Sequence, residues 1–316
     1  MKRFLGFRVL LGLTVAFASC ALLSAAEPSG IPAEVSELIT EPETTLKLWP
    51  STPPGGIPEG IGDEKWTPGN ENPPIVRVGN VSIPTLGFYP AENPNGACVV
   101  IFPGGGFEIL AYNLEGTEIA QWLNSIGVSA VIVKYRVPRR AGLPKHYAPL
   151  QDAQRAIRLT RAYAKEWGID PSKIGVLGFS AGGRLTVAAA LDYDVKTYDP
   201  IDEADELSAR PDFAIPIYPA YLMDDERDMK ASTPLSDELN IREGLPPFFI
   251  SVAGNDENRP AAAARFFIQL KEVGVPCELH IPIKGGHGYG LRSYGGVASE
   301  WGSNCEKWMR AMNILP

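Results

Sequence analysis

The chain has 316 residues, of which 45% are hydrophobic and 21% are charged, a balance that is ordinary for a globular protein. Its 37 Asp and Glu residues outnumber its 29 Lys and Arg residues and give a net charge of −8 at pH 7. An acidic protein repels nucleic acids and other anionic polymers, so the chain is a poor candidate for binding either class.

Residues 1–26 have the pattern of an export signal rather than of a folded segment. Three basic residues occur among the first eight, the run from Val9 to Leu23 is almost wholly apolar, and Ser24-Ala-Ala26 offers small residues to a signal peptidase. We expect cleavage after Ala26 and a periplasmic or extracellular protein with 26 basic and 37 acidic residues. Stable membrane insertion is not expected, because no later stretch approaches about 20 apolar residues. A lipoprotein anchored at Cys20 is a minority alternative.

Residues 27–74 are rich in proline, glycine and acidic residues. The segments Pro50–Gly56 and Asn70–Pro74 resist regular structure, because proline lacks an amide N–H and fixes its φ angle. We expect this stretch to be a leader that drapes over the domain or links it to the cell envelope. The catalytic domain is predicted at residues 75–316.

From Ile75 onward, apolar strand-like runs alternate with helical stretches. Strands are expected at Ile75–Val78, Thr85–Phe88, Ala97–Phe102, Ser129–Tyr135, Ile174–Leu177, Phe213–Tyr218, Phe248–Ala253 and Cys277–Ile283. Helices are expected at Glu115–Ile126, Leu150–Trp167, Leu185–Leu191, Ala261–Val273 and Ser299–Met312, with a cap or loop at Leu222–Gly244. Strands joined by helices of this length form right-handed crossovers. The sequence therefore predicts an α/β fold with a mostly parallel central sheet and helices on both faces.

The pentapeptide Gly178–Gly182, of the form G-x-S-x-G, stands between the strand Ile174–Leu177 and the helical segment Leu185–Leu191. This context is typical of the nucleophile elbow of α/β-hydrolases, where a sharp turn exposes a serine hydroxyl. Side chains at the two glycines would collide with the neighbouring strand and helix. We therefore predict that Ser180 is a catalytic nucleophile; a plain glycine–serine loop is the competing interpretation.

Loops after two later strands supply the partners that a serine nucleophile needs. A serine hydroxyl is a weak nucleophile until a base takes its proton, and a histidine does this near neutral pH. In the elbow plan the acid and then the histidine follow the serine, each just beyond a strand end. Asp256 follows the strand Phe248–Ala253 and His287 follows the strand Cys277–Ile283, so both join Ser180 in a predicted triad.

Further residues compete for the roles of acid and base. Glu257 is one residue further into the loop, and Asp224 and Asp225 lie a few residues past the end of the preceding strand. The chain holds only three histidines. Because His146 precedes the serine and His280 lies within a predicted strand, we expect both to be structural.

Backbone amides near the serine are candidates for an oxyanion hole. Ala181, immediately after the nucleophile, offers one N–H group. Gly105 and Gly106 follow the strand Ala97–Phe102, and glycines there let bare backbone approach the reacting carbonyl. Loss of one such donor typically costs about 3 to 4 kcal/mol of transition-state stabilisation. A phosphate cradle is the competing interpretation, but the usual spacings are missing and no basic residue follows closely.

Cysteine usage and histidine spacing argue against a metal site. Cys98, Cys277 and Cys305 remain after the export signal, which allows at most one internal disulfide. Cys98 and Cys277 lie in apolar strand-like runs and are expected to be buried thiols. Because the sequence has no C-x-x-C pair and no His/Cys cluster, we predict neither a structural zinc ion nor another cofactor.

Motifs along the chain resemble those of the secreted bacterial α/β-hydrolase carboxylesterases related to acetyl xylan esterases, the BD-FAE-like group. The matching segments are Leu46–Pro50, Phe102–Phe107, Leu114–Ala120, Lys134–Pro138, Asp152–Ile157, Gly178–Gly183 and Gly285–Gly290. They span roughly residues 46–313, nearly the whole chain after the signal. The resemblance implies Ser180, Asp256 and His287 as the triad, and ester hydrolysis without a metal.

The chain departs from that family pattern at three places. The family usually has a histidine before the Glu–Gly pair, where this chain has Leu114. After the elbow it usually has Gly-Gly-His, where this chain has Arg184, and its acid loop often has two aspartates, where this chain has Asn255-Asp256. No triad member is removed, but the first two changes bear on the acyl or alcohol pocket.

The sequence thus predicts an exported serine carboxylesterase that removes acetyl or another short acyl group from plant or algal polysaccharide or oligosaccharide. Short chains are expected because Phe107 and Tyr221 are bulky and the segment up to Gly244 is too short for a large lid. A prolyl-peptidase-like hydrolase shares the elbow and triad order, although the chain shows no propeller domain to gate peptides. A feruloyl-type esterase, an acyltransferase that excludes water and a non-catalytic binding module are three further hypotheses.

Overall fold

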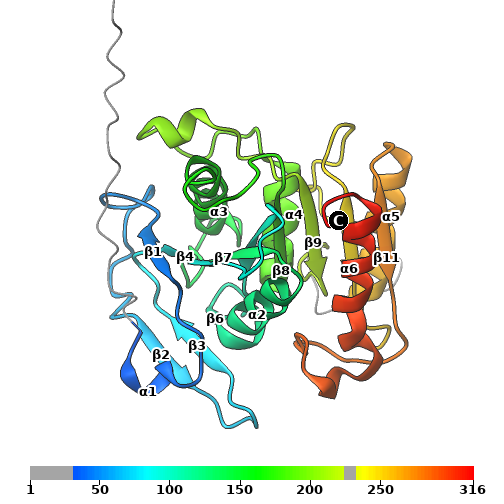
Figure 1. Ribbon diagram of the computed structural model, residues 1–316, viewed down its shortest axis with the longest axis horizontal. Coiled ribbons are helices and arrows are strands. Elements are labelled where there is room, and N and C mark those ends of the chain that lie inside the picture. Colours follow the sequence, from blue (N-terminus) through cyan, green and yellow to red (C-terminus); the bar gives the residue numbers. More distant parts are fainter. Residues whose placement is uncertain (1–30, 224–232) are drawn as a thin grey trace, which may run out of the picture.

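The computed structural model describes residues 31–223 and 233–316, and an eight-stranded sheet runs through its centre (Figure 1). The strands lie in the order β1-β4-β7-β5-β8-β9-β10-β11. Their bounds are β1 (Thr44–Lys47), β4 (Thr85–Tyr89), β7 (Ser129–Lys134), β5 (Cys98–Phe102), β8 (Ile174–Phe179), β9 (Phe213–Ile217), β10 (Phe248–Ser251) and β11 (Cys277–His280). The strands from β7 to β11 run parallel, and β4 and β1 add an antiparallel edge, so the predicted mostly parallel sheet is confirmed.

Every residue of the four central strands β7, β5, β8 and β9 is buried. Parallel strands that are covered by helices on both faces need continuous apolar runs, because neither face meets water. This is why the sequence of these strands shows no alternation of polar and apolar residues. The edge strand β11, by contrast, is only partly buried along its whole length.

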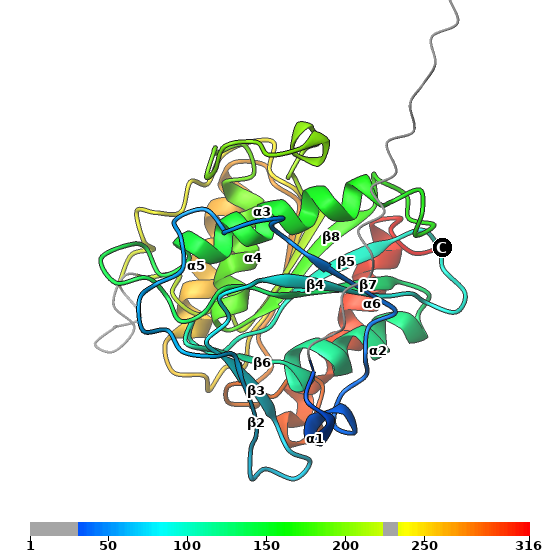
Figure 2. The same ribbon diagram turned by 90° about the vertical axis from the view of Figure 1, so that its left-hand side faces the viewer.

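Helices cover both faces of the sheet (Figure 2). One face carries α3 (Tyr147–Ala162), α4 (Ala181–Leu191) and α5 (Arg259–Glu272), and the other carries α2 (Glu118–Ser125) and α6 (Trp301–Ala311). Shorter helical turns are α1 (Ala33–Ser36), Asn113–Thr117, Glu203–Glu206 and Ser293–Glu300. In the two described ranges, no helix combines the length and apolar character that crossing a membrane requires.

The stretch that the sequence suggested as a leader also contributes strands. β1 pairs with β4 at the edge of the central sheet, and β2 (Lys65–Pro68) forms a small antiparallel sheet with β3 (Val76–Gly79) and β6 (Ile109–Ala111). The strand expected at Ile75–Val78 therefore belongs to the small sheet. Neighbouring prolines hid these strands from sequence reasoning, because pairing partners rather than local propensity decide whether an edge strand forms. The predicted export signal, including Cys20, lies outside the described residues.

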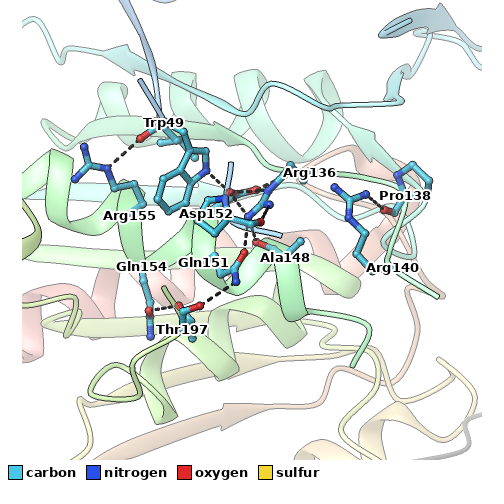
Figure 3. A network of polar contacts seen from close by, with 12 residues as sticks. Trp49, Arg136, Pro138, Arg140, Ala148, Gln151, Asp152, Gln154, Arg155 and Thr197 are labelled. Carbon is cyan, nitrogen blue, oxygen red and sulfur yellow. Dashed lines mark hydrogen bonds and ion pairs between the residues drawn. The ribbon is translucent and has the colours of Figure 1, made fainter. Parts of the chain in front are cut away.

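A buried set of polar contacts fastens the segment between β1 and β2 to the body of the fold (Figure 3). Asp152 on α3 is fully buried and accepts hydrogen bonds from Arg136 Nε at 3.0 Å and from Trp49 Nε1 at 2.8 Å. The buried Arg136 also donates to the carbonyl oxygen of Pro54 at 2.6 Å and to Gln151 Oε1 at 2.8 Å. Buried charges persist only when they are paired and hydrogen-bonded, as both are here. We call these five residues the anchor network.

The three cysteines within the described residues are all free thiols. Cys98 and Cys305 are buried, and burial raises the pKa of both thiols. Cys277 is only partly buried, so the prediction of a buried thiol holds for Cys98 and not fully for Cys277. The difference follows from position, because Cys98 begins a central strand and Cys277 begins the edge strand β11.

Candidate active site

Ser180 lies on a sharp turn between β8 and α4, at the carboxyl end of the parallel strands. Its backbone angles are φ 53° and ψ −116°, a conformation that L-residues rarely adopt. A Cβ on Gly178 would lie 2.2 Å from the carbonyl oxygen of Gly182, and a Cβ on Gly182 would lie 2.0 Å from that of Phe102. Both positions therefore need glycine, for the steric reason that the sequence suggested.

His287 lies between Ser180 and Asp256 and contacts both. Its Nε2 atom is 2.8 Å from Ser180 Oγ, and its Nδ1 atom is 2.7 Å from Asp256 Oδ2. Because a carboxylate only accepts hydrogen bonds, we assign the proton to Nδ1, which leaves Nε2 to accept from the serine hydroxyl. Asp256 is 2% exposed, whereas the imidazole side chain is 32% exposed. The structure thus brings together the three residues proposed from the sequence, with the imidazole open to a substrate.

Asp256, and not the neighbouring Glu257, faces the imidazole. The second carboxylate oxygen of Asp256, Oδ1, accepts a hydrogen bond from Arg259 Nη1 at 2.8 Å, which fixes the carboxylate at the start of α5. The side chain of Glu257 is 73% exposed and contacts Arg259 instead, at 3.1 Å. The more distant candidates for the acid, Asp224 and Asp225, lie outside the described residues.

The remaining two histidines have different surroundings. His280 in β11 lies 2.6 Å from Glu278, measured from Nε2 to Oε1. His146 is buried, and its burial and the nearby charge of Arg184 lower its pKa to about 3. The imidazole of His146 is therefore neutral at physiological pH. Within the described residues, no group of three or more His, Cys, Asp or Glu side chains could hold a metal ion.

The loop after β5 presents backbone amides beside the serine. A Cβ on Gly104 would lie only 3.0 Å from Ser180 Cβ, so the loop touches the turn. Gly105 and Gly106 have φ angles of 134° and 67°, which favour glycine. Among the described residues, no acceptor takes the N–H groups of Gly105, Gly106 or Ala181. Ala181 is also the first residue of α4, where the helix dipole adds partial positive charge.

Sequence reasoning missed a buried hydrogen-bonded chain that joins the elements around the serine. The Glu115 carboxylate, 3% exposed, accepts from the Gly104 N–H at 2.7 Å and from the Tyr218 hydroxyl at 2.8 Å. That hydroxyl accepts from the Gly290 N–H at 3.0 Å, and the Tyr218 ring lies edge-on to His287, with ring centroids 5.0 Å apart. These hydrogen bonds therefore connect the glycine loop, the end of β9 and the loop that carries His287.

Burial raises the pKa of Glu115, while the hydrogen bond from Tyr218, the charge of His287 and the Gly104 amide act in the opposite direction. The available signal in the sequence was the motif Leu114-Glu115-Gly116, which resembles the esterase family. No role followed from it, because its partner Tyr218 lies 103 positions further along the chain.

Comparison with known proteins finds esterases. The BD-FAE family model matches residues 88–217. An acetylxylan esterase of Xylanibacter ruminicola is 27% identical over 71% of this chain. The match covers 47% of that relative, so this chain spans about half of its length. An acetyl ester-xyloside bifunctional hydrolase from Caldicellulosiruptor lactoaceticus is 32% identical and superposes with a TM-score of 0.67 over 87% of this chain and 98% of that one. A butyrate-bound thermophilic esterase of Thermogutta terrifontis is 26% identical, with a TM-score of 0.58 over 75% of this chain and 91% of its own.

Proposed function

This chain belongs to the α/β-hydrolase esterases of the BD-FAE group, and we propose that it is a serine carboxylesterase that hydrolyses short acyl esters, chiefly acetyl esters, of plant or algal polysaccharide or oligosaccharide. The observation that carries the proposal is the position of His287, within hydrogen-bond distance of both Ser180 and Asp256. The acetyl and carbohydrate parts are supported by the similarity to an acetylxylan esterase and to an acetyl ester-xyloside hydrolase.

In the proposed first half-reaction, Ser180 Oγ attacks the carbonyl carbon of the ester while His287 Nε2 takes the hydroxyl proton. The carbonyl electron pair moves to the oxygen, where the N–H groups of Gly105, Gly106 and Ala181 would stabilise the negative charge. The tetrahedral intermediate then expels the sugar alkoxide, which receives the proton from the imidazolium. An acyl group remains bound to the serine.

The second half-reaction uses the same groups with water as the nucleophile. The imidazole of His287 takes a proton from water, the hydroxide attacks the acyl-enzyme, and the serine leaves with the proton returned to it. Asp256 holds the imidazole in the correct tautomer and stabilises the imidazolium in both halves. Arg259 occupies the other carboxylate oxygen and so keeps Asp256 aimed at the ring.

The site geometry favours small acyl groups over the bulky aromatic acyl group of a feruloyl ester. The ring of Phe107 is buried and stacks on the ring of Tyr221, with centroids 5.9 Å apart, beside the glycine loop. The hydroxyl of Tyr221 is 3.7 Å from where a Cβ on Gly106 would lie. These two rings therefore limit the space next to the proposed oxyanion hole.

The proposal is tested by labelling and by substrate comparison. A fluorophosphonate should modify Ser180, as shown by mass spectrometry of the labelled peptide, and should leave the exposed Ser172 untouched. Acetate should be released from acetylated xylo-oligosaccharides and from 4-nitrophenyl acetate. Labelling of another serine would contradict the nucleophile, and faster cleavage of a prolyl peptide than of every ester would favour a prolyl-peptidase-like hydrolase.

We further propose that residues 1–26 direct export, because a polysaccharide substrate is encountered outside the cytoplasm. The support is the basic, apolar and small-residue pattern of this segment. Amino-terminal sequencing of protein recovered from the periplasm or medium should begin at Glu27. Recovery of a lipid-modified chain that begins at Cys20 would contradict this cleavage site.

A further inference from the structure

A cavity of about 850 Å³ lies beside the reacting residues and has no part in the mechanism described above. Its walls are the loops that follow β5 and β7, the start of α4, and the segments after β9. Its volume falls within the range of about 300 to 1,000 Å³ that is typical of small-molecule sites. An acetyl group would occupy only a small part of it, so the cavity has room for a larger portion of the substrate.

Backbone hydrogen bonds connect the cavity walls to the reacting centre. The amide of Arg184 donates to the carbonyl oxygen of Ser180 at 3.0 Å, and the amide of Arg139 donates to that of Phe107 at 2.7 Å. Tyr221, which stacks on Phe107, also lines the cavity. The cavity is therefore walled in part by the elements that carry Ser180 and Phe107, and we take it to be the space for a group that neighbours the ester.

Positive charge predominates in the cavity. Its positively charged side chains are Arg139, Arg140, Lys145 and Arg184, and its negatively charged side chains are Glu108 and Glu238. The two carboxylates contact Arg139 at 2.9 Å and Arg184 at 3.1 Å, respectively. His146, held neutral by its burial, adds no charge. The lining thus has an excess of two positive charges, although the whole chain has a net charge of −8.

The two cations that no described carboxylate pairs with are Arg140 and Lys145. Arg140 Nη1 donates to the carbonyl oxygen of Pro138 at 3.2 Å, apart from the anchor network (Figure 3). Its Nη2 atom is buried and has no acceptor among the described residues. Lys145 Nζ lies 4.4 Å from the centroid of the Tyr221 ring and makes a cation–π contact with it. This contact leaves the three N–H donors of the ammonium group available to a carboxylate.

We propose that this cavity binds a carboxylate carried by the substrate, in the first place that of a uronate sugar next to the acylated sugar. A carboxylate in the cavity would form charge-assisted hydrogen bonds with Arg140 and Lys145, the two lining cations that no described carboxylate pairs with. Arg184, which lines the cavity and pairs with Glu238, adds to the local positive charge. The inference rests on the proposed function, since it concerns the substrate of the same serine.

The test compares two substrates that differ only in the carboxylate: a mono-acetylated methyl glucuronoside and the equivalent methyl glucoside. We expect kcat/KM to favour the acidic sugar by about tenfold or more, the effect of one charge-assisted hydrogen bond, mainly through a lower KM. Added salt should shrink this preference, because it screens the attraction. Equal kcat/KM values for the two sugars would overturn the assignment of the site to a uronate carboxylate.

Variants assign the preference to named side chains. Arg140→Gln and Lys145→Met should each reduce the acidic-to-neutral ratio severalfold, and Arg140→Lys should retain part of it because the charge stays. The matched control is Lys271→Met, which removes an exposed positive charge from α5 outside the cavity and should leave the ratio as in the wild type. An equal fall in the ratio for Lys271→Met would mean that overall charge, and not the cavity, sets the preference, and would overturn the proposal.

A second substrate pair places the carboxylate on the acyl side: the monosuccinate ester of 4-nitrophenol and its methyl succinate counterpart. A preference confined to this pair would keep the carboxylate site but assign it to the acyl group. No preference in either pair would overturn the site. Labelling of Ser180 and hydrolysis of the neutral acetate in the same preparation show separately whether the proposed esterase function stands.

Discussion

The anchor network and the centre around Ser180 each contain a buried carboxylate, Asp152 and Glu115, but only Asp152 has a cationic hydrogen-bond partner. Asp152 faces the guanidinium of Arg136 and the indole N–H of Trp49, so its charge is compensated on the spot. Glu115 is held by a tyrosine hydroxyl and a backbone amide, and burial raises its pKa. The first arrangement holds two segments together, whereas the second connects the glycine loop, Tyr218 and the loop that carries His287.

Backbone conformation follows the same division. Most of the non-glycine residues with positive φ in the described part of the chain belong to the loops around Ser180, namely Phe107, Ser180, Tyr218, Tyr221 and Glu257. Such conformations cost of order 1 to 3 kcal/mol each and persist only where the surrounding fold enforces them. The anchor network therefore stabilises the fold, whereas the strained loops around Ser180 lower its stability.

Ser180→Ala should have the largest effect and should act on activity alone. We expect kcat to fall by about four to six orders of magnitude, because the proposed nucleophile is lost, while Tm stays close to that of the wild type. Esterase assays and differential scanning calorimetry measure the two quantities on one sample. The control is Ser172→Ala, an exposed serine outside the site, and a Tm that falls with Ser180→Ala but not with the control would break the proposed separation.

Asp152→Asn should have the opposite signature, with a large effect on stability. The substitution leaves the buried guanidinium of Arg136 without its counter-charge, and we expect a loss of about 3 to 5 kcal/mol in the free energy of unfolding. Urea denaturation measures it, and Asp199→Asn, which breaks an exposed pair with Lys196, should hardly change stability. A folded Asp152→Asn protein whose kcat drops as far as that of Ser180→Ala would contradict the comparison.

Glu115→Gln should lower kcat by about tenfold to a hundredfold with little change in KM, because hydrogen bonds to a charged acceptor contribute about 1.5 to 3 kcal/mol. The amide keeps one acceptor oxygen and has an NH2 group in place of the other, so either the Gly104 N–H or the Tyr218 hydroxyl loses its acceptor. The residues that contact the substrate stay in place. Tyr218→Phe breaks the same chain, so the two substitutions together should cost less than the sum of the single effects. Additive effects of the two substitutions, or a change confined to KM, would show that the hydrogen bonds of Glu115 and Tyr218 do not position the catalytic groups.

The raised pKa of Glu115 also predicts how stability depends on pH. The folded protein holds the proton of this carboxyl more tightly than the unfolded chain, so above the ordinary value of 4.5 the unfolded chain releases it first. The contribution of Glu115 to the free energy of unfolding therefore falls as pH rises from 4.5 through the raised pKa. Relative to Glu115→Gln, which does not titrate, the wild type should lose stability over that range, and a relative gain in urea denaturation would contradict the direction.

Acyl chain length should have the smallest effect on kcat/KM for each added methylene group. A pocket that admits an added methylene gains up to about 0.8 kcal/mol from its burial, but the stacked rings of Phe107 and Tyr221 leave little room. We expect 4-nitrophenyl acetate to be the best or nearly the best substrate of a series up to octanoate, with rates that fall beyond about four carbons. A steady climb in kcat/KM up to octanoate would reveal a deep apolar tunnel and replace the deacetylase proposal with a lipase-like one.

The sequence by itself determined the features that local patterns encode. Continuous apolar runs predicted the buried parallel strands, because strands covered on both faces have no polar side to show. The Gly178–Gly182 pentapeptide predicted the turn that carries Ser180, and positions just beyond strand ends predicted Asp256 and His287. The His287 ring lies 2.7 Å from Asp256 Oδ2 and 2.8 Å from Ser180 Oγ. The strand runs and the pentapeptide are local signals, whereas the choice of Asp256 and His287 also used their order after Ser180.

Only the tertiary structure decided which distant residues meet. The strands β1 and β2 form because partners elsewhere in the chain complete their hydrogen bonds. Glu115 finds Tyr218 and Asp152 finds Trp49, each across 103 positions, and the cationic cavity collects side chains from loops after β7 and β9 and from α4. The sequence does not record such pairs, because burial and hydrogen bonding depend on where the fold brings a side chain and not on the residues next to it.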